Sequence, residues 1–534
     1  MAITAMDMVR KTKLTTLFFA LLNSNLVSAG DWKFEPSIVI DETYTDNVKL
    51  VTNDKVSSLV SQTGLEIESS YEAQQAVFNF SSQSTYALYS HNHELDNDYH
   101  TLASDFRLQL WPNGIILVGS ADIANRSQNS SRNAIADIAS ADTVRVETYN
   151  GGVEYNVNNS DFTVNSSIGY RQITSEDSVG DREGVVAQLS SRNGTGARNI
   201  FWALEHSYQE LKNNSQEGKL SQSEIKIGLI TDYRINPFIR YYDEENSGDL
   251  RSTNRSIESN SYGLGIRWLI SPRLYVDISY NKPIGSKLNI DGDVQEEYVN
   301  AALKWQPSIR TTLEANVSER FYGNSYGLDF THKNKRLTNT ITYVEDIKTF
   351  TRNNFVANLV GYYFCPGNTS TTIDECTLED STVISPGEPA YGIFPIQDFT
   401  LIQDNVFSLY KTLTWRSVLA LPRTTFRLNA NWQRRDNLDT RNEDERSIIN
   451  FGVRRNISGR SSLNLDVSYT ENNFLITTDS ERIDRYRRYK LSYEKSLNSA
   501  LSIDLSLGYV DRSSSNIKFN YEEGRVSAKI TKGF

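Results

Sequence analysis

The fold is decided by an alternating stretch near the carboxyl end of the chain. Residues 501–509 read Leu-Ser-Ile-Asp-Leu-Ser-Leu-Gly-Tyr, so apolar residues alternate with polar or small ones without a break. Successive side chains of a strand point to opposite faces, and this period of two predicts a β-strand with one apolar face. The pattern recurs at 162–170, 274–280, 426–432 and 463–469, and each apolar row ends in Tyr or Trp.

The composition looks water-soluble, with 23% charged residues and a mean hydropathy of −0.49. A membrane-spanning strand shows lipid only every second side chain, so an average hydropathy does not exclude a membrane β-barrel. The formal net charge of −11 argues against nucleic acid as a partner, because phosphate binding needs clustered Lys and Arg.

Connection lengths separate a membrane barrel from a soluble sandwich, because barrels alternate short periplasmic turns with longer outer loops. Longer polar stretches are found between the short turns, for example Asn125 to Asp142, Glu244 to Glu258, Arg434 to Arg446 and Glu471 to Glu481. Pro, Gly and Asn mark the short turns. These turns are predicted at Trp111 to Gly114, Asn158 to Ser160, Asn236-Pro237, Ser271 to Arg273, Gln306 to Ser308, Leu421 to Arg423, Ser458 to Arg460 and Leu497 to Ser499.

This rhythm predicts one all-β domain over residues 30–534, a single antiparallel up-and-down transmembrane barrel. We expect about 24 strands, within about 22–26, since bacterial single-chain barrels have even strand numbers. A plugged active transporter is disfavoured, because strand-like sequence already begins at Trp32.

Both chain ends fit an exported barrel. Arg10, Lys11 and Lys13 precede an apolar run that starts at Leu14, and small residues before Ala29 predict a cleaved signal peptide over residues 1–29. The terminal Phe534 resembles the assembly signal of outer-membrane barrels, although Lys532 departs from its pattern. We therefore expect localisation in the outer membrane of a Gram-negative bacterium. The expected partners are outer-membrane lipid, lipopolysaccharide and the barrel assembly machinery, with a monomer as the default state.

The residues opposite the apolar rows are predicted to face the lumen. Because both charge signs occur, we expect a wet and weakly selective interior. The alternative is that these charges pair and are purely structural. The candidates are Arg267, Asp277, Arg310, Glu314, Arg427, Asp466, Arg488, Lys490 and Asp504.

One long excursion interrupts the rhythm, from about residue 346 to 405, and it is expected to lie outside or to fold inward and constrict the pore. It contains both cysteines of the chain, Cys365 and Cys376. In an exported protein two cysteines this close predict a disulfide. A metal pair or a redox dithiol is the rival interpretation, but no further ligands lie nearby.

A polar segment follows the first predicted strand, and its Glu42, Asp46 and Asn47 lie at the barrel mouth. These residues are suited to bind a cation or a sugar hydroxyl, or else to form an ordinary Asx turn. The segment Glu42 to Asn47, together with Trp32-x-x-x-Pro36, resembles the outer-membrane β-barrel family associated with the PEP-CTERM/exosortase and exopolysaccharide system. That resemblance implies passage of polysaccharide or protein across the outer membrane, with exopolysaccharide as a partner, and it implies no catalytic residues.

Nothing in the sequence indicates an enzyme. The histidines, His91, His93, His100, His206 and His332, are not accompanied by a nucleophile in a recognisable motif. We expect no catalytic residue, no metal and no cofactor. The sequence thus predicts a porin-like channel for export or passage of polysaccharide or other polar solutes. The alternative is a non-conducting barrel that anchors or receives extracellular polysaccharide or surface protein through its outer loops.

Overall fold

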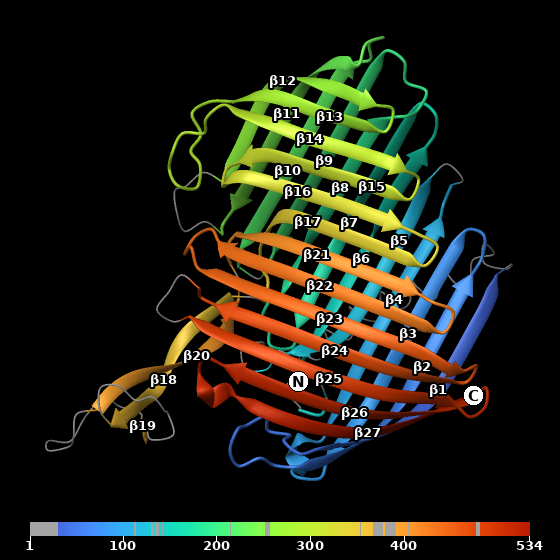
Figure 1. Cartoon of the computed structure of the whole chain (residues 1–534), viewed down its shortest axis with the longest axis vertical. Helices are drawn as coiled ribbons and strands as arrows, with labels where there is room; N and C mark the ends of the chain where they lie inside the picture. Colours follow the sequence, from blue (N-terminus) through green and yellow to red (C-terminus); the bar gives the residue numbers. More distant parts are fainter. Residues whose placement is uncertain are drawn as a thin grey trace, which may run out of the picture.

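The chain forms one closed barrel of 24 antiparallel strands (Figure 1), which confirms the predicted fold class and strand number. The computed structural model describes residues 30–534 except 112–113, 130–132, 134–137, 141–142, 214, 251–256, 353, 367–376, 380–390, 404 and 477–480. The predicted signal peptide and Cys376 lie outside the described residues. In the described part of the chain, no helix is long and apolar enough to cross a bilayer.

Consecutive strands pair as neighbours around the ring, as in an up-and-down barrel. The first half of the barrel consists of β1 (Asp31–Thr45), β2 (Ser58–Glu72), β3 (Ala76–Tyr89), β4 (Asn97–Gln109), β5 (Ile115–Ser127), β6 (Thr143–Asn158), β7 (Phe162–Ser175), β8 (Arg182–Asn193), β9 (Ile200–Lys212), β10 (Glu217–Leu229), β11 (Ile235–Gly248) and β12 (Glu258–Ser271). A 3-10 turn, η2 (His93–Leu95), precedes β4.

The second half continues the same path. It consists of β13 (Leu274–Pro283), β14 (Tyr298–Ser308), β15 (Thr311–Arg320), β16 (Gly323–Lys333), β17 (Leu337–Lys348), β21 (Ser408–Ala420), β22 (Thr424–Asn437), β23 (Glu443–Ser458), β24 (Ser461–Phe474), β25 (Arg482–Ser496), β26 (Leu501–Ser514) and β27 (Tyr521–Gly533), with a 3-10 turn η4 (Ile517–Phe519) before β27. Because β17 pairs directly with β21, the excursion between them is not part of the wall.

The outer face of the barrel carries a belt of exposed apolar side chains. Leu264 is 73% exposed and Ile168, Ile239 and Leu507 are more than half exposed. In a water-soluble protein so much contiguous apolar surface would be unstable, but lipid covers it at no cost. The alternation that predicted the strands therefore places the apolar rows on the lipid side and the polar rows inside.

Tyrosine–glutamate pairs mark the edge of this belt toward the longer loops. The Tyr469 hydroxyl donates to Glu471 at 2.6 Å and the Tyr343 hydroxyl donates to Glu345 at 2.8 Å. Tyr149 with Glu147 and Tyr208 with Glu210 repeat the arrangement on other strands. Because a tyrosine ring can lie in lipid while its hydroxyl meets water, these pairs mark the outer interface of the membrane.

The strands continue past this interface, so several predicted loop boundaries are corrected. Residues 434–437 and 443–446, predicted as loop, belong to β22 and β23. Their outer faces carry ion pairs in place of apolar residues, for example Arg434 Nε to Asp436 Oδ1 at 2.8 Å. Both faces are therefore polar there, and the period of two is lost from the sequence although the strand persists. Likewise Asn236-Pro237 lies inside β11, and the turn before it covers residues 230–234.

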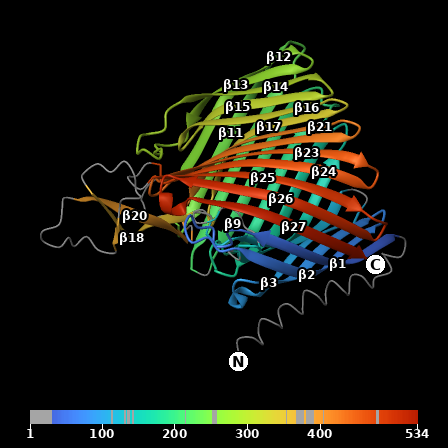
Figure 2. The same cartoon turned by 60° about the horizontal axis from the view of Figure 1, so that its bottom comes forward.

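The excursion forms a separate three-stranded sheet of β18 (Asn354–Pro366), β19 (Thr377–Glu379) and β20 (Tyr391–Ile402). This sheet projects from the long-loop end of the barrel, away from the lumen (Figures 1 and 2). The sheet therefore does not fold into the lumen, contrary to one of the two expected placements. Because Asn354 and Ile402 are register partners, the sheet joins the barrel through two adjacent strands.

The ring closes where β1 pairs with β27, from Ser37 opposite Gly533 to Thr45 opposite Arg525. The amide N–H of Phe534 donates to Pro36 O at 3.0 Å, and its ring is 73% exposed. The Lys532 Nζ lies 5.9 Å from the centroid of that ring. The terminal residue thus extends the seam ladder and presents an open aromatic face.

The predicted mouth motif fastens this seam at its other end. Asn47 is fully buried, and its Nδ2 donates to Val51 O at 2.7 Å and to Glu522 O at 2.9 Å. Asp46 Oδ1 accepts from Gly524 N at 2.8 Å, and Thr45 Oγ1 donates to buried Glu523 at 2.5 Å. Each of these residues is thus held by the last strand. Glu42 points outward and accepts from Ser61 Oγ at 2.6 Å.

We predict that Asn47→Ala weakens the closure of the ring. It removes a buried amide and leaves carbonyl groups without donors, at a cost of about 1–3 kcal/mol. The midpoint of heat unfolding, read as the change in migration of unboiled protein on a denaturing gel, should fall. Asn53→Ala, at an exposed position of the same loop, is the control and should leave the midpoint unchanged; equal midpoints for both variants would contradict the assignment.

Candidate functional site

The inner wall of the barrel is the candidate functional site, because side chains of alternating parity from every strand converge on it. On β13 the outward Ile278 and Tyr280 are exposed, whereas Asp277, Ser279 and Asn281 are buried inside. On the other strands, likewise, the face opposite the exposed apolar side chains is the inward face. The inward side chains divide into three regions: a filled side, a polar recess and an open basic wall.

The filled side spans β10–β16, where inward ion pairs pack against one another. Arg267 Nε and Nη2 donate to Asp277 at 2.7 and 2.9 Å, and its guanidinium lies 4.0 Å from the Phe201 ring centroid. Arg320 pairs with Glu244, and both are buried. Arg240 Nε donates to Glu224 at 2.7 Å. These charges stabilise the wall by pairing with one another, which favours the structural alternative for Arg267 and Asp277.

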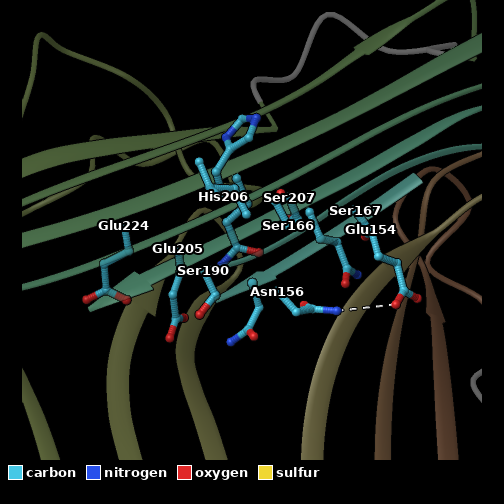
Figure 3. A pocket seen from close by; sticks show the side chains of 13 residues that line it. Glu154, Asn156, Ser166, Ser167, Ser190, Glu205, His206, Ser207 and Glu224 are labelled. Atoms are coloured by element: carbon cyan, nitrogen blue, oxygen red, sulfur yellow. Dashed lines mark hydrogen bonds between the residues drawn. The ribbon is translucent and has the colours of Figure 1, made fainter. Parts of the chain in front are cut away.

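The recess lies on the inner face of β6–β10 and has a volume of about 450 Å³ (Figure 3). Its inward lining is made of small hydroxyl, amide and carboxylate side chains, among them Glu154, Asn156, Ser190 and Glu205. Asn156 Nδ2 donates to Glu154 Oε2 at 3.3 Å. His206 points to the opposite side of the sheet in Figure 3, where its Nδ1 lies 2.9 Å from Ser223 Oγ. The recess offers hydrogen-bonding groups but no nucleophile paired with a base.

The open basic wall lies on β21–β25. Arg427, Arg488 and Lys490 are exposed on the inward face. The side-chain position of Gly452 lies within 4.0 Å of Arg427 Cβ and 2.9 Å of Asp466 Oδ1, so these residues share one face. Arg416, on the inward face of β21, is also exposed. It was not among the predicted lumen residues, although its position between Trp415 and Ser417, which face outward, indicates an inward side chain.

The other lumen candidates are distributed around the ring. Glu314 faces inward from β15 and pairs with Lys304 Nζ at 2.5 Å, and half-buried Asp504 faces inward from β26. Arg310 is corrected: it lies exposed in the turn between β14 and β15, outside the strands. The prediction failed because β14 ends at Ser308, before Arg310, although the alternation of polar and apolar residues continues beyond that point.

The outer mouth is crossed by the described residues of the two segments that connect the excursion to the wall, residues 349–352, 403 and 405–407, here called the feet. Arg352 donates from Nη1 and Nη2 to both carboxylate oxygens of Asp177 at 2.6 and 2.7 Å. Gly180 N donates to Gln403 Oε1 at 2.6 Å, and Asn213 Nδ2 donates to Asn405 Oδ1 at 3.2 Å. The feet thus reach from β17 and β21 across to the loops of β7–β10.

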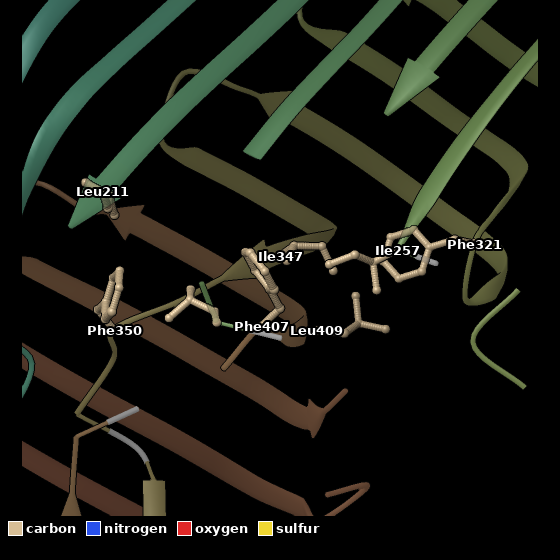
Figure 4. Packing of buried hydrophobic residues seen from close by; sticks show 8 residues of the cluster. Leu211, Ile257, Phe321, Ile347, Phe350, Phe407 and Leu409 are labelled. Carbon is tan, nitrogen blue, oxygen red and sulfur yellow. The ribbon is translucent and has the colours of Figure 1, made fainter. Parts of the chain in front are cut away.

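An apolar cluster supports the feet from within (Figure 4). Phe350 and Phe407 pack with Leu211 of β9, with Phe321 and with Leu409 of β21, all buried. Burying a side chain of this size contributes about 1.5–3 kcal/mol, so the cluster holds opposite walls together. The feet therefore cross the outer mouth, while the sheet β18–β20 projects outward.

The Asp177–Arg352 clamp has an electrostatic signature. Burial alone would raise the pKa of Asp177, but hydrogen bonds from Arg352, Val179 N and Ser175, with the charge of Arg352, outweigh it and lower the pKa below 3.8. The clamp therefore stabilises the ionised carboxylate. Gly180 at φ +83° passes so close to Arg352 that a Cβ there would lie 2.6 Å from its Cγ.

Two of the histidines lie in exposed pairs with neighbouring carboxylates. His93 Nδ1 contacts Asp96 at 3.2 Å and His100 Nε2 contacts Asp98 at 2.8 Å, as exposed pairs. Within the described ranges, no group of three or more His, Cys, Asp or Glu is placed to hold a metal. The predicted Cys365–Cys376 disulfide lies outside the described residues.

Comparison with known proteins yields likeness in fold only. No family model matches the sequence, and no curated protein matches it significantly. Similar solved structures include the siderophore receptor PirA from Pseudomonas aeruginosa (TM-score 0.37, 9% identity, covering 94% of this chain and 80% of that one). Others are a loop-deletion mutant of OmpT, an outer membrane protein of Vibrio cholerae (0.31, 8%, 95% and 100%), and Pseudomonas aeruginosa OccK8 (0.30, 11%, 94% and 98%).

Localisation follows from the closed ring and its apolar belt. A membrane-spanning, even-stranded, single-chain barrel is the architecture of the Gram-negative outer membrane. The chain is therefore an outer-membrane β-barrel, as the sequence predicted.

We predict that Asp177→Asn loosens the feet. A bidentate charge-assisted pair contributes about 1.5–3 kcal/mol, so local opening should increase about 10- to 100-fold. Hydrogen exchange of the amides of Val179 and Gly180 reports that opening. Asp54→Asn, at an exposed position in a different outer loop, should leave these rates unchanged, and protection that survives Asp177→Asn would contradict the clamp.

The pH dependence of the clamp has a defined sign. Because the folded pKa of Asp177 is lowered, its stabilisation is complete above the ordinary value of 3.8 and disappears as the pH falls through the folded pKa. The difference in unfolding midpoint between wild type and Asp177→Asn should stay constant from about pH 8 to about pH 5 and shrink below 3.8. A difference that grows on acidification would refute this sign.

Proposed function

We propose that the protein is an outer-membrane channel that passes a polar solute or polymer, with export or passage of polysaccharide as its main role. The observation that supports this most is the exposure of inward charges on β21–β25. Arg427, Arg488 and Lys490 face the lumen and are exposed. A charge in a filled interior would be desolvated at a cost of several kcal/mol unless paired, so exposed inward charges indicate water around them.

The size of the ring supports the same proposal. Barrel diameter grows with strand number, and 16–18 strands already leave an aqueous channel. Here the ring has 24 strands, and inward charged side chains are exposed on β21–β25. The recess on β6–β10, lined by serine, asparagine and glutamate, offers the hydroxyl and amide partners that a sugar requires.

The resemblance to the exosortase-associated barrel family gives this channel a proposed setting. In that setting the exported polymer is an exopolysaccharide, and the barrel assembly machinery inserts the chain into a lipopolysaccharide-containing membrane. The exposed Phe534 at the seam is the proposed assembly signal.

The projecting sheet favours a second candidate function. A barrel that only conducts has no need of β18–β20 beyond its mouth, whereas a barrel that anchors or receives extracellular polysaccharide or surface protein has a use for such an extension. In this alternative the feet keep the mouth closed and the sheet binds the partner.

Single-channel recording separates the two functions. We expect the purified protein to give discrete conductance steps in a planar bilayer. Replacing residues 355–401 by a two-residue Asn-Gly turn joins the register partners Asn354 and Ile402, and conductance should not change because the sheet lies outside the lumen. Removing the feet as well should raise conductance. A folded protein that never conducts, even without the feet, would refute the channel and favour the receptor.

A further inference from the structure

We propose that a strip of cations on β21–β25 binds the anionic groups of passing solutes, so that the channel prefers carboxylate-bearing ligands. This basic strip consists of Arg416, Arg427, Arg446, Arg488 and Lys490. The inference rests on the proposed channel and names its substrate class: an anionic solute, of which an acidic polysaccharide is one source and small anions are the other.

The strip consists of cations without ion-pair partners. Among the described residues, none of its members makes an ion pair, and Arg446 Nε is buried without a hydrogen-bond acceptor. For the four arginines the cross-strand neighbours explain this, because side chains directly opposite each other are the ones that can pair. The cross-strand neighbours are Thr340 and Asn429 for Arg416, Val418 and Gly452 for Arg427, Gln433 and Asn472 for Arg446, Ser468 and Val510 for Arg488, and Asp466 and Gly508 for Lys490. Lys490 lies opposite Asp466 but makes no ion pair with it.

Inward cations on β10–β16 are paired, whereas Arg171 on β7 and Arg192 on β8 are exposed and make no ion pair within the described ranges. On β10–β16, Arg240, Arg267 and Arg320 each have a carboxylate within hydrogen-bond distance. Beside the strip itself, Arg454 pairs with Glu494 at 3.1 Å. The strip differs from the positions of Arg171 and Arg192 by number, because it gathers five unpaired cations on neighbouring strands, and it is therefore the part of the wall best suited to bind an external anion.

The unpaired state of the strip does not come from a shortage of carboxylates in the chain. The formal net charge is −11, so carboxylates outnumber cations and acceptors for five more ion pairs exist in the sequence. On the wall of the strip, Asp466 and Asp504 are outnumbered by its cations. These two carboxylates make no ion pair within the described ranges, and further unpaired carboxylates, such as Glu66 on β2 and Glu205 on β9, lie on other strands.

The chemistry of the strip selects its ligand. A guanidinium presents a planar fork of donors that matches a carboxylate, and the pair strengthens where water is partly excluded. Several such groups along adjacent strands bind a chain of carboxylates at successive points while each contact stays weak enough to exchange. Gly452 and Gly508 lie between the charged side chains of neighbouring strands and leave room beside them.

Reversal potentials in a potassium chloride gradient test the selectivity. The wild-type full chain in a planar bilayer should favour chloride over potassium. Arg427→Glu with Arg488→Glu should lower the chloride-to-potassium permeability ratio by about tenfold, the lower end of the concentration effect of a charged cleft. Lys335→Glu with Arg336→Glu, in the turn between β16 and β17, changes the net charge equally and should leave the ratio close to wild type.

The source of the anion is tested by current block. Oligogalacturonate added to one side should block the wild-type current, an uncharged malto-oligosaccharide of equal length should not, and the double variant should lose the block. Chloride preference without a block by oligogalacturonate would support small anions and overturn the polymer as ligand.

The failures of the two proposals are distinguishable. A conducting channel that prefers potassium, or does not discriminate, overturns the basic strip and leaves the channel function intact. A folded protein without conductance overturns the channel itself. If Arg427→Glu with Arg488→Glu fails to fold on a heat-modifiability gel, Arg427→Gln with Arg488→Gln provides the same comparison with a smaller shift, and an unchanged ratio in that variant contradicts the inference.

Discussion

Every other property of this protein depends on the closure of one hydrogen-bonded ladder. Inside a bilayer no water is available to satisfy a backbone N–H or C=O, so a sheet is stable there only when it has no edge. The pairing of β1 with β27 removes the last edge. The seam is reinforced at both ends, by the amide of Phe534 on Pro36 and by the contacts of Asp46 and Asn47 with residues 522–524. In the sequence, the segment Glu42 to Asn47 resembled a ligand site because carboxylate and amide side chains can either bind a ligand or make structural hydrogen bonds.

The sequence predicted the fold well because one physical rule, lipid on alternate side chains, repeats along the entire chain. Stretches such as 501–509 were sufficient to identify strands, and Pro and Gly located most short turns. Prediction failed where that rule stops applying. Beyond the outer interface the outward face of β22 and β23 carries ion pairs, so polar residues occupy both faces and the strand resembles a loop. Arg310 was misplaced for a related reason, since the alternation continues into the turn.

The inner wall was predictable in composition but not in organisation. Parity placed Arg427, Asp466, Arg488 and Lys490 inside, yet pairing depends on which residues lie opposite across strands, and register is a tertiary property. The sequence gives no sign that Arg267 meets Asp277 whereas Arg427 meets Gly452. The result is a barrel in which the inward charges of β10–β13 are paired whereas several inward cations of β21–β25 are exposed without ion-pair partners. The mixed charge signs in the sequence did not indicate this separation. The feet were equally hidden, because Arg352 and Asp177 are far apart in the chain and meet only across the mouth.

The seam also has a consequence for biogenesis. Since the partner of β1 is β27, which follows all the other strands of the ring in the chain, the ring cannot close until β27 has been synthesised. Until then β1 carries an unpaired edge that can recruit other chains. A nascent polypeptide of this design must be shielded in transit and handed over unfolded, and a premature stop anywhere before β27 yields a curved, open sheet instead of a smaller pore.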